Sequence, residues 1–253
     1  MSSWQKPAVD LINKFGQSSV WPLLEILTVL PEEVNSRSLR LGANRRLEIK
    51  QELSSAAPTV TEFLKACLNS GGENPSIHTR ILKCFTSWVS IQAITLAEIA
   101  ENIVVAHAFH ILSNHQAVPV VHEAATDCVC TLLQCLEDNN NQQSLELQLF
   151  QGVISLENGF HLSVAHEDQE KSMNYCRIFT ELAESFLEKI VNVETNNKPH
   201  FAIKVLDLVL TCVGHHDYEV AEITFNLWYR LSEDLYRKNN DALTALLNLM
   251  WND

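Results

Sequence analysis

Five basic side chains gather in one short stretch of an otherwise acidic chain. Arg37, Arg40, Arg45, Arg46 and Lys50 lie where an even spread of the chain's 18 lysines and arginines would place about one. Guanidinium and ammonium groups bind phosphates and carboxylates. The stretch could therefore hold a phosphate or nucleic acid, contact a protein partner, or act as a structural joint.

The charge of the whole chain bears on that choice. The sequence has 18 Lys and Arg against 31 Asp and Glu, a net charge of −13. Binding to nucleic acid without sequence preference depends on basic surface, so this acidity argues against direct nucleic-acid binding. An acidic surface is compatible with a basic protein partner, because complementary fields steer encounters, although any acidic soluble protein would look the same.

The histidines do not form a recognisable metal site. His122 and Glu123 begin the H-E-x-x-H pattern of zinc proteases, but position 126 is a threonine, so the second zinc ligand is missing. His107 and His110 lie one helical turn apart without a third ligand at a matching spacing. The phosphate-loop, dinucleotide-binding and nucleophile-elbow motifs are also absent from the sequence. We therefore predict no catalytic residue, no metal and no cofactor, and a protein that is not an enzyme.

The seven cysteines indicate buried, reduced thiols. On a helix, Cys128 and Cys130 would point about 200° apart and could not share one metal ion. Cys128 and Cys135 share an apolar helix face, as core residues do. The first residues, MSSWQKPAVD, contain no long apolar run, and no uncharged apolar stretch reaches ~18 residues. We predict an intracellular protein without a signal peptide or a membrane-inserted segment.

The elements that carry these residues are predicted to be helices throughout. Apolar residues make up 46 % of the chain and recur at helical spacing, and only 7 Gly and 7 Pro interrupt them. Strict alternation typical of strands is not found. The predicted helices are 4–15, 20–35, 45–69, 76–93, 96–113, 119–137, 142–164, 168–192, 200–213 and 218–237, with a last one from Asp241.

These helices are predicted to pair. Helices that begin near residues 20, 76, 119, 168 and 218 follow one another at about 56, 43, 49 and 50 residues, close to the period of HEAT-type helical hairpins. A weak echo supports the repeat, since FTSW (85–88) and FNLW (225–228) both place Phe and Trp on one helix face. We predict one continuous solenoid over residues 1–253, of about five helix pairs. Neither terminus resembles a polar capping repeat, which predicts a longer array.

The basic stretch then falls in the loop of one hairpin, between helices 20–35 and 45–69. Glu32 and Glu33 end the first helix, and Arg45 and Arg46 begin the second, so both charge pairs oppose their own helix dipoles. In a hairpin those two ends are neighbours, and we predict that the arginines offset the glutamates as a structural joint. Arg37 and Arg40 have no such local explanation and are candidate partner contacts.

Several long segments resemble a known family. The segments are PEEVNSRSLRLGANRR (31–46), HEAATDCVC (122–130), LQLFQGVISLE (147–157), NYCRIFTELAESFLEKIV (174–191) and YEVAEITFNLWYRLSEDLY (218–236). They resemble the transportin-SR-like nuclear import receptors of the importin-β (karyopherin-β) superfamily, over essentially the whole chain. The resemblance implies an all-α fold, a right-handed superhelix of HEAT repeats without catalytic activity.

The same resemblance implies a function and a set of partners. Receptors of this kind import serine/arginine-rich splicing factors, touch Phe-Gly nucleoporins in the nuclear pore, release cargo to Ran-GTP, and shuttle between cytoplasm and nucleus. This chain resembles only the later part of the N-terminal arch and its continuation, which implies a partial receptor. The alternatives are a sister bidirectional importin with other cargo, and a HEAT scaffold without a role in transport.

Overall fold

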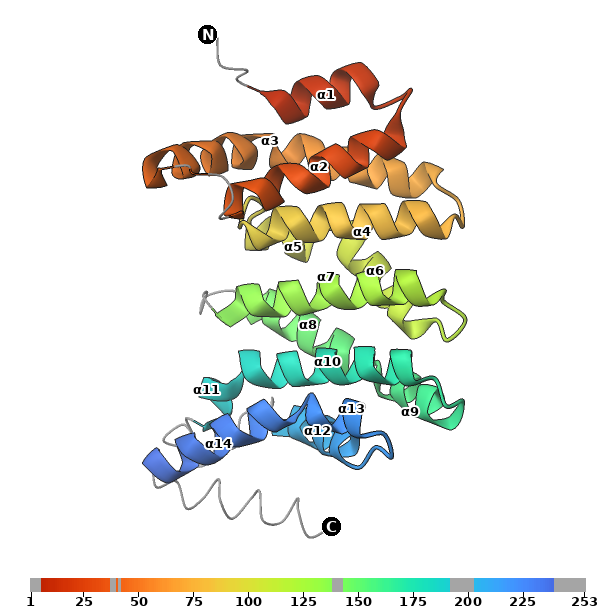
Figure 1. The fold of residues 1–253 in the computed structure, drawn as a ribbon, viewed down its shortest axis with the longest axis vertical. Coiled ribbons are helices and arrows are strands. Elements are labelled where there is room, and N and C mark those ends of the chain that lie inside the picture. The colour runs from red at the N-terminus through yellow and green to blue at the C-terminus, as the bar shows by residue number, and fades with distance from the viewer. Residues whose placement is uncertain (1–5, 37–39, 41, 138–142, 192–202, 239–253) are drawn as a thin grey trace.

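All regular structure in the described part of the chain is helical (Figure 1). The structure is a computed structural model, and it describes residues 6–36, 40, 42–137, 143–191 and 203–238. Its helices are α1 (Pro7–Phe15), α2 (Val20–Asn35), α3 (Ala43–Ser70), α4 (Pro75–Ser90), α5 (Leu96–Ala100), α6 (Ile103–Ser113), α7 (Pro119–Glu137), α8 (Gln143–Ile154), α9 (Glu157–Ala165), α10 (Gln169–Ser185), α11 (Leu187–Val191), α12 (Lys204–Val213), α13 (Tyr218–Glu222) and α14 (Phe225–Lys238).

The helices form two layers that run the length of the molecule. One layer, which we call the A layer, stacks α2, α4, α7, α10 and the α13–α14 pair in order, and α3, α5, α6, α8, α9 and α12 lie behind it (Figure 1). Consecutive A-layer helices pack directly on one another from α2 to α4, α7 and α10. This is the stack of helix pairs that the repeat spacing predicts, an all-α HEAT-type solenoid.

Capping residues explain where the helices begin and why some predicted helices are divided. The side chains of Asn74, Thr95, Asn102, Asp168 and Asp217 accept backbone N–H groups at the starts of α4, α5, α6, α10 and α13. Asn102 starts a new helix inside the predicted helix 96–113, which the structure divides into α5 and α6.

Three other predicted helices were too long in the same way. Helix 142–164 is α8 and α9, helix 168–192 is α10 and α11, and helix 218–237 is α13 and α14. In each case the hydrophobic spacing continues across the break, so periodicity alone could not reveal it. The last predicted helix, from Asp241, lies outside the described residues.

Side-chain hydrogen bonds join neighbouring A-layer helices at backbone carbonyls. From α4, the indole of Trp88 donates to the Leu27 carbonyl at 2.8 Å, and the hydroxyl of Ser87 donates to the Thr28 carbonyl at 2.7 Å. Between α10 and α7, the Ser185 hydroxyl donates to the Leu133 carbonyl at 3.0 Å. These bonds fix α4 against α2 and α10 against α7, because a buried donor is costly to leave unpaired.

The two F-x-x-W segments have different environments. Phe85 and Trp88 are completely buried between α2 and α7, whereas Phe225 is 46 % exposed on α14. The repeated sequence pattern therefore does not correspond to a repeated environment of the Phe side chain. The ring of Phe225 contacts the exposed Tyr218 edge-on, with centroids 5.9 Å apart.

Candidate partner-binding surfaces

The predicted partner contacts lie in the passage from α2 to α3. Arg40 is exposed there, and Arg37 lies outside the described residues. Their role as partner contacts stays a prediction. The other charged residues of this hairpin, Glu32, Glu33, Arg45 and Arg46, are all described.

Arg46 closes the C-terminal end of α2. Its guanidinium donates to the carbonyl of Val34 at 2.6 Å and to the carbonyl of Ser36 at 3.3 Å. Carbonyls at this end of a helix have no intrahelical partner, and a positive charge beside them also matches the helix dipole. Arg46 therefore ties the start of α3 to the end of α2 through backbone carbonyls.

Arg45 has different partners from those predicted. Its guanidinium lies 2.8 Å from a carboxylate oxygen of Glu48 and 4.0 Å from one of Glu52, both on its own helix. Glu32 and Glu33 are exposed, and within the described residues no ion pair joins either of them to Arg45. A partner one turn away on the same helix is reached without ordering a loop, which explains this choice.

Arg46 is expected to matter more for stability than Arg45. Arg46→Ala should destabilise the protein by about 1–2 kcal/mol, because half-buried carbonyls lose a charged donor. Arg45→Ala removes only exposed ion pairs and should change stability by ~0.5 kcal/mol or less. Urea unfolding followed by circular dichroism gives the comparison, and equal midpoints for the two variants would rule out the Arg46 joint.

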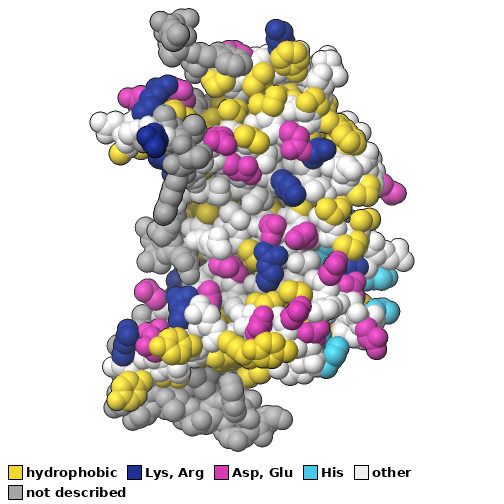
Figure 2. Space-filling view, viewed as in Figure 1, with side chains coloured by type: hydrophobic (Ala, Val, Ile, Leu, Met, Phe, Trp, Pro, Cys, Tyr) yellow, Lys and Arg dark blue, Asp and Glu magenta, His cyan; other side chains and the backbone are white. Residues whose placement is uncertain are grey.

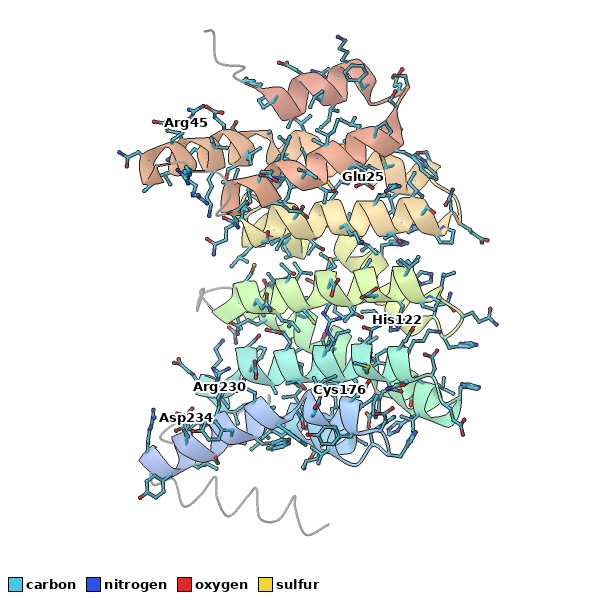
Figure 3. All side chains as sticks on the ribbon, in the orientation of Figure 1. Glu25, Arg45, His122, Cys176, Arg230 and Asp234 are labelled. Atoms are coloured by element: carbon cyan, nitrogen blue, oxygen red, sulfur yellow. The ribbon has the colours of Figure 1, made fainter. Side chains whose placement is uncertain are left out.

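Ion pairs follow the exposed side of the A layer. They join consecutive helices and are Arg80 with Glu25, Arg177 with Asp127 at 2.6 Å, and Arg230 with Glu184 at 3.5 Å. Basic and acidic side chains accordingly alternate on this face (Figure 2), and Figure 3 shows Glu25 at the α2–α4 junction and Arg230 beside α10. Each of these three arginines is therefore paired with a carboxylate of the neighbouring A-layer helix.

A groove opens on this face between the first turns of α7 and α10. It is a cavity of about 470 Å³, and its lining residues are Pro119, Val120, Glu123, Glu170, Met173, Asn174 and Arg177. We call it the α7–α10 groove. Val120 is 48 % exposed, which is high for a large apolar side chain. The groove therefore combines apolar contact area with charged walls.

Buried polar contacts hold one wall of this groove. The Asn174 amide nitrogen lies 3.2 Å from Nδ1 of His122, and its oxygen accepts from Arg177 at 3.4 Å. His122 is fully buried, and burial lowers its pKa to about 4, with nearby Lys171 adding to the effect. A neutral His122 accepts through Nδ1, so Asn174 has a single favoured orientation.

His78 and His107 form a hydrogen-bonded pair. His78 donates through Nε2 to the Gly72 carbonyl at 2.8 Å, so its Nδ1 accepts from Nε2 of His107, also at 2.8 Å. Across the described ranges no group of three or more His, Cys, Asp or Glu side chains is arranged to hold a metal ion. None of the described helices is long and apolar enough to cross a membrane.

Cys128 and Cys130 of α7 are both buried and point toward different neighbouring helices. Cys128 faces Thr86 of α4, and Cys130 lies near Arg177 of α10. Burial raises the pKa of both thiols to about 12, so they are not reactive at neutral pH. The predicted divergence of the two side chains thus places each in a different helix interface.

Sequence analysis did not identify the α7–α10 groove. One signal was available: Val120, Glu123 and Asp127 on α7 occupy the same repeat positions as Glu170, Met173 and Arg177 on α10. Each triplet has the i, i+3, i+7 spacing of one helix face. Comparing polar positions between repeats, rather than only apolar ones, would have pointed to this surface.

Two family models match the chain. The model described as "Exportin 1-like protein" matches residues 1–129, and the model described as "Transportin-3/Importin-13 second TPR domain" matches residues 167–252. The first therefore covers the part from α1 into α7, and the second the part from α10 onward.

Curated relatives match almost the whole length of this chain. Importin-13 of Gallus gallus is 25 % identical over 246 residues, which cover 92 % of this chain and 24 % of importin-13. Transportin MOS14 of Arabidopsis thaliana is 24 % identical, covering 86 % of this chain and 22 % of the relative. The mRNA transport regulator MTR10 of Saccharomyces cerevisiae is 26 % identical, covering 92 % and 25 %. The chain spans about a quarter of the length of these relatives.

Proposed function

Because this chain belongs to the exportin-1-like family of the importin-β superfamily of nuclear transport receptors, we propose that it is a receptor segment that helps to carry protein cargo into the nucleus. The observation that carries this proposal is the pair of family matches, which together extend from residue 1 to residue 252 with one gap between them. The stack of helix pairs supports it, since such stacks bind partners along extended surfaces.

We propose serine/arginine-rich proteins as the cargo class and Ran-GTP as the regulator. The net charge of −13 favours a strongly basic cargo. The A layer adds to this, because its arginines are paired internally and leave carboxylates available. Phe-Gly nucleoporins are the proposed contacts in the pore, and the proposed location alternates between cytoplasm and nucleus. Residues 1–253 are proposed to act as one continuous solenoid segment.

Binding to a recombinant serine/arginine-rich repeat domain tests the proposal. We expect the intact chain to bind this domain with an affinity that falls steeply as salt rises, because exposed charges are screened. Ran loaded with GTP should release the bound domain, and Ran loaded with GDP should not. Surface plasmon resonance with the chain immobilised gives both results, and an acidic globular protein of similar charge serves as the matched control surface.

Two outcomes would contradict the proposal in different ways. Release that does not depend on the nucleotide would favour a HEAT scaffold without a role in transport. Ran-dependent behaviour without binding of the serine/arginine-rich domain would favour a sister importin with other cargo. The second outcome has a specific motive, because importin-13 and transportin relatives match this chain at nearly the same identity.

A further inference from the structure

Each wall of the α7–α10 groove carries an apolar and an acidic side chain. Val120 of α7 and Met173 of α10 supply apolar area, next to Pro119 at the start of α7. Val120 is about half exposed, so this area is open to a ligand rather than covered by the fold. A cavity of about 470 Å³ is large enough for one or two large apolar side chains.

The charges around this apolar area are unequal. Glu123 and Glu170 line the groove and are exposed, and neither forms an ion pair with any described residue. The positive charge of Arg177 is paired with Asp127, because its guanidinium lies 2.6 Å from the Asp127 carboxylate. The remaining local charge is therefore negative, and the positive dipole end of each helix offsets only part of it.

Lys171, a second cation on α10, does not offset the negative charge of the groove. Lys171 of α10 turns inward, where its ammonium donates to the His115 carbonyl at 2.6 Å and lies 3.4 Å from the Asp168 carboxylate. Helix α7, from Pro119 to Glu137, contains no lysine or arginine. A ligand in the groove thus meets two exposed carboxylates, Glu123 and Glu170, and one lining cation, Arg177, whose charge is already paired with Asp127.

The groove is also held in shape before any ligand arrives. Asn174 is fixed between His122 and Arg177, and Arg177 is fixed by Asp127. Contacts that join α7 to α10 in this way keep the distance between the two carboxylate-bearing helices constant. A preorganised surface loses less freedom when it binds a ligand.

We propose that the α7–α10 groove binds a short cationic segment of a partner protein, with one apolar side chain on Val120 and Met173 and flanking arginines or lysines on Glu123 and Glu170. The segment is extended or irregular, so that its apolar side chain reaches the cavity while its charged neighbours reach the two walls. The inference deepens the proposed function and rests on it only for the source of the segment, which is the cargo.

Fluorescence anisotropy with a labelled peptide tests the groove directly. The probe is a short peptide in which arginines flank one central leucine, and the protein is the whole chain at low salt. Glu123→Gln with Glu170→Gln should weaken binding about tenfold, since two exposed ion pairs are lost. Replacing the central leucine of the peptide by serine should weaken binding of the unaltered protein by a further ~5–10-fold.

The matched control removes the same charge elsewhere. Glu32→Gln with Glu33→Gln also neutralises two exposed carboxylates, at the end of α2, and should change affinity less than about twofold. Both double variants should keep the thermal midpoint of the unaltered protein, since all four glutamates are exposed. Equal weakening by the two double variants would show that only net charge attracts the peptide, and would overturn the proposal.

A second readout locates the peptide. With a photoreactive leucine in the centre of the probe, crosslinks should fall on the first turns of α7 and α10, as read by mass spectrometry. Crosslinks confined to other helices would overturn the groove. The two proposals can fail separately. If the peptide binds the groove but binding does not respond to Ran, the proposed function is contradicted and the groove is not. If a cargo domain binds equally well to the Glu123→Gln, Glu170→Gln protein, the groove is contradicted and the proposed function is not.

Discussion

Replacing Phe85 by alanine is expected to destabilise the protein by about 3–5 kcal/mol, the usual loss when a fully buried aromatic ring is deleted. Phe85 is completely buried on α4, which packs against both α2 and α7. The loss should concentrate there, because a stack of repeats gains its stability from interfaces between neighbours. Urea unfolding should show the lower midpoint, and hydrogen exchange should rise most in α2, α4 and α7.

Phe225→Ala is the matched control for that prediction. The residue occupies the same place in the second F-x-x-W segment but is 46 % exposed, with one aromatic contact to Tyr218. Its removal should reduce stability by about 1 kcal/mol or less. A loss equal to that of Phe85→Ala would mean that α14 is covered at Phe225, contrary to the exposure seen here.

The fold could be predicted largely because its interfaces are apolar and periodic. The spacing of apolar residues gave the A-layer helices α2, α4, α7 and α10 to within a few residues at their starts. What periodicity could not give were the breaks, since a polar cap such as Asn102 interrupts the backbone without interrupting the apolar stripe. The F-x-x-W pattern likewise could not distinguish the buried Phe85 from the exposed Phe225, because burial depends on the neighbouring helices.

The candidate surfaces were harder to predict because they depend on contacts between helices. The basic stretch was visible as a local excess of charge, yet the partners of Arg45 and Arg46 follow from geometry: one lies along α3 and the other reaches the end of α2. The α7–α10 groove joins residues from separate repeats, and because Arg177 pairs with Asp127, Glu123 and Glu170 are its exposed carboxylates outside any ion pair of the described residues. No local pattern contains that information.

Replacing Asp168 by alanine is expected to destabilise the protein by about 2–4 kcal/mol, because one carboxylate serves two purposes. It caps α10 by accepting the backbone N–H of Lys171 at 3.1 Å, and removing a cap costs about 1 kcal/mol. It also lies 3.4 Å from the Lys171 ammonium, whose side chain is only 11 % exposed. Without Asp168 that charge keeps the His115 carbonyl as a partner but loses its counter-ion, which adds a further ~1–3 kcal/mol, reduced because Asp168 itself is partly exposed.

Two further variants separate the cap from the ion pair. Asp217 caps α13 by accepting the Glu219 N–H at 2.9 Å and forms no ion pair with any described residue, so Asp217→Ala should lose only about 1 kcal/mol. Adding Lys171→Met to Asp168→Ala removes the uncompensated charge and should recover roughly half of the loss, because an apolar chain of similar length suits that buried position. Thermal and urea unfolding of the four proteins measure these differences. The prediction is wrong if Asp168→Ala and Asp217→Ala shift the midpoints equally and Lys171→Met recovers no stability. The Lys171 ammonium would then be solvated, and its charge would not contribute to the contact with the His115 carbonyl between α6 and α7.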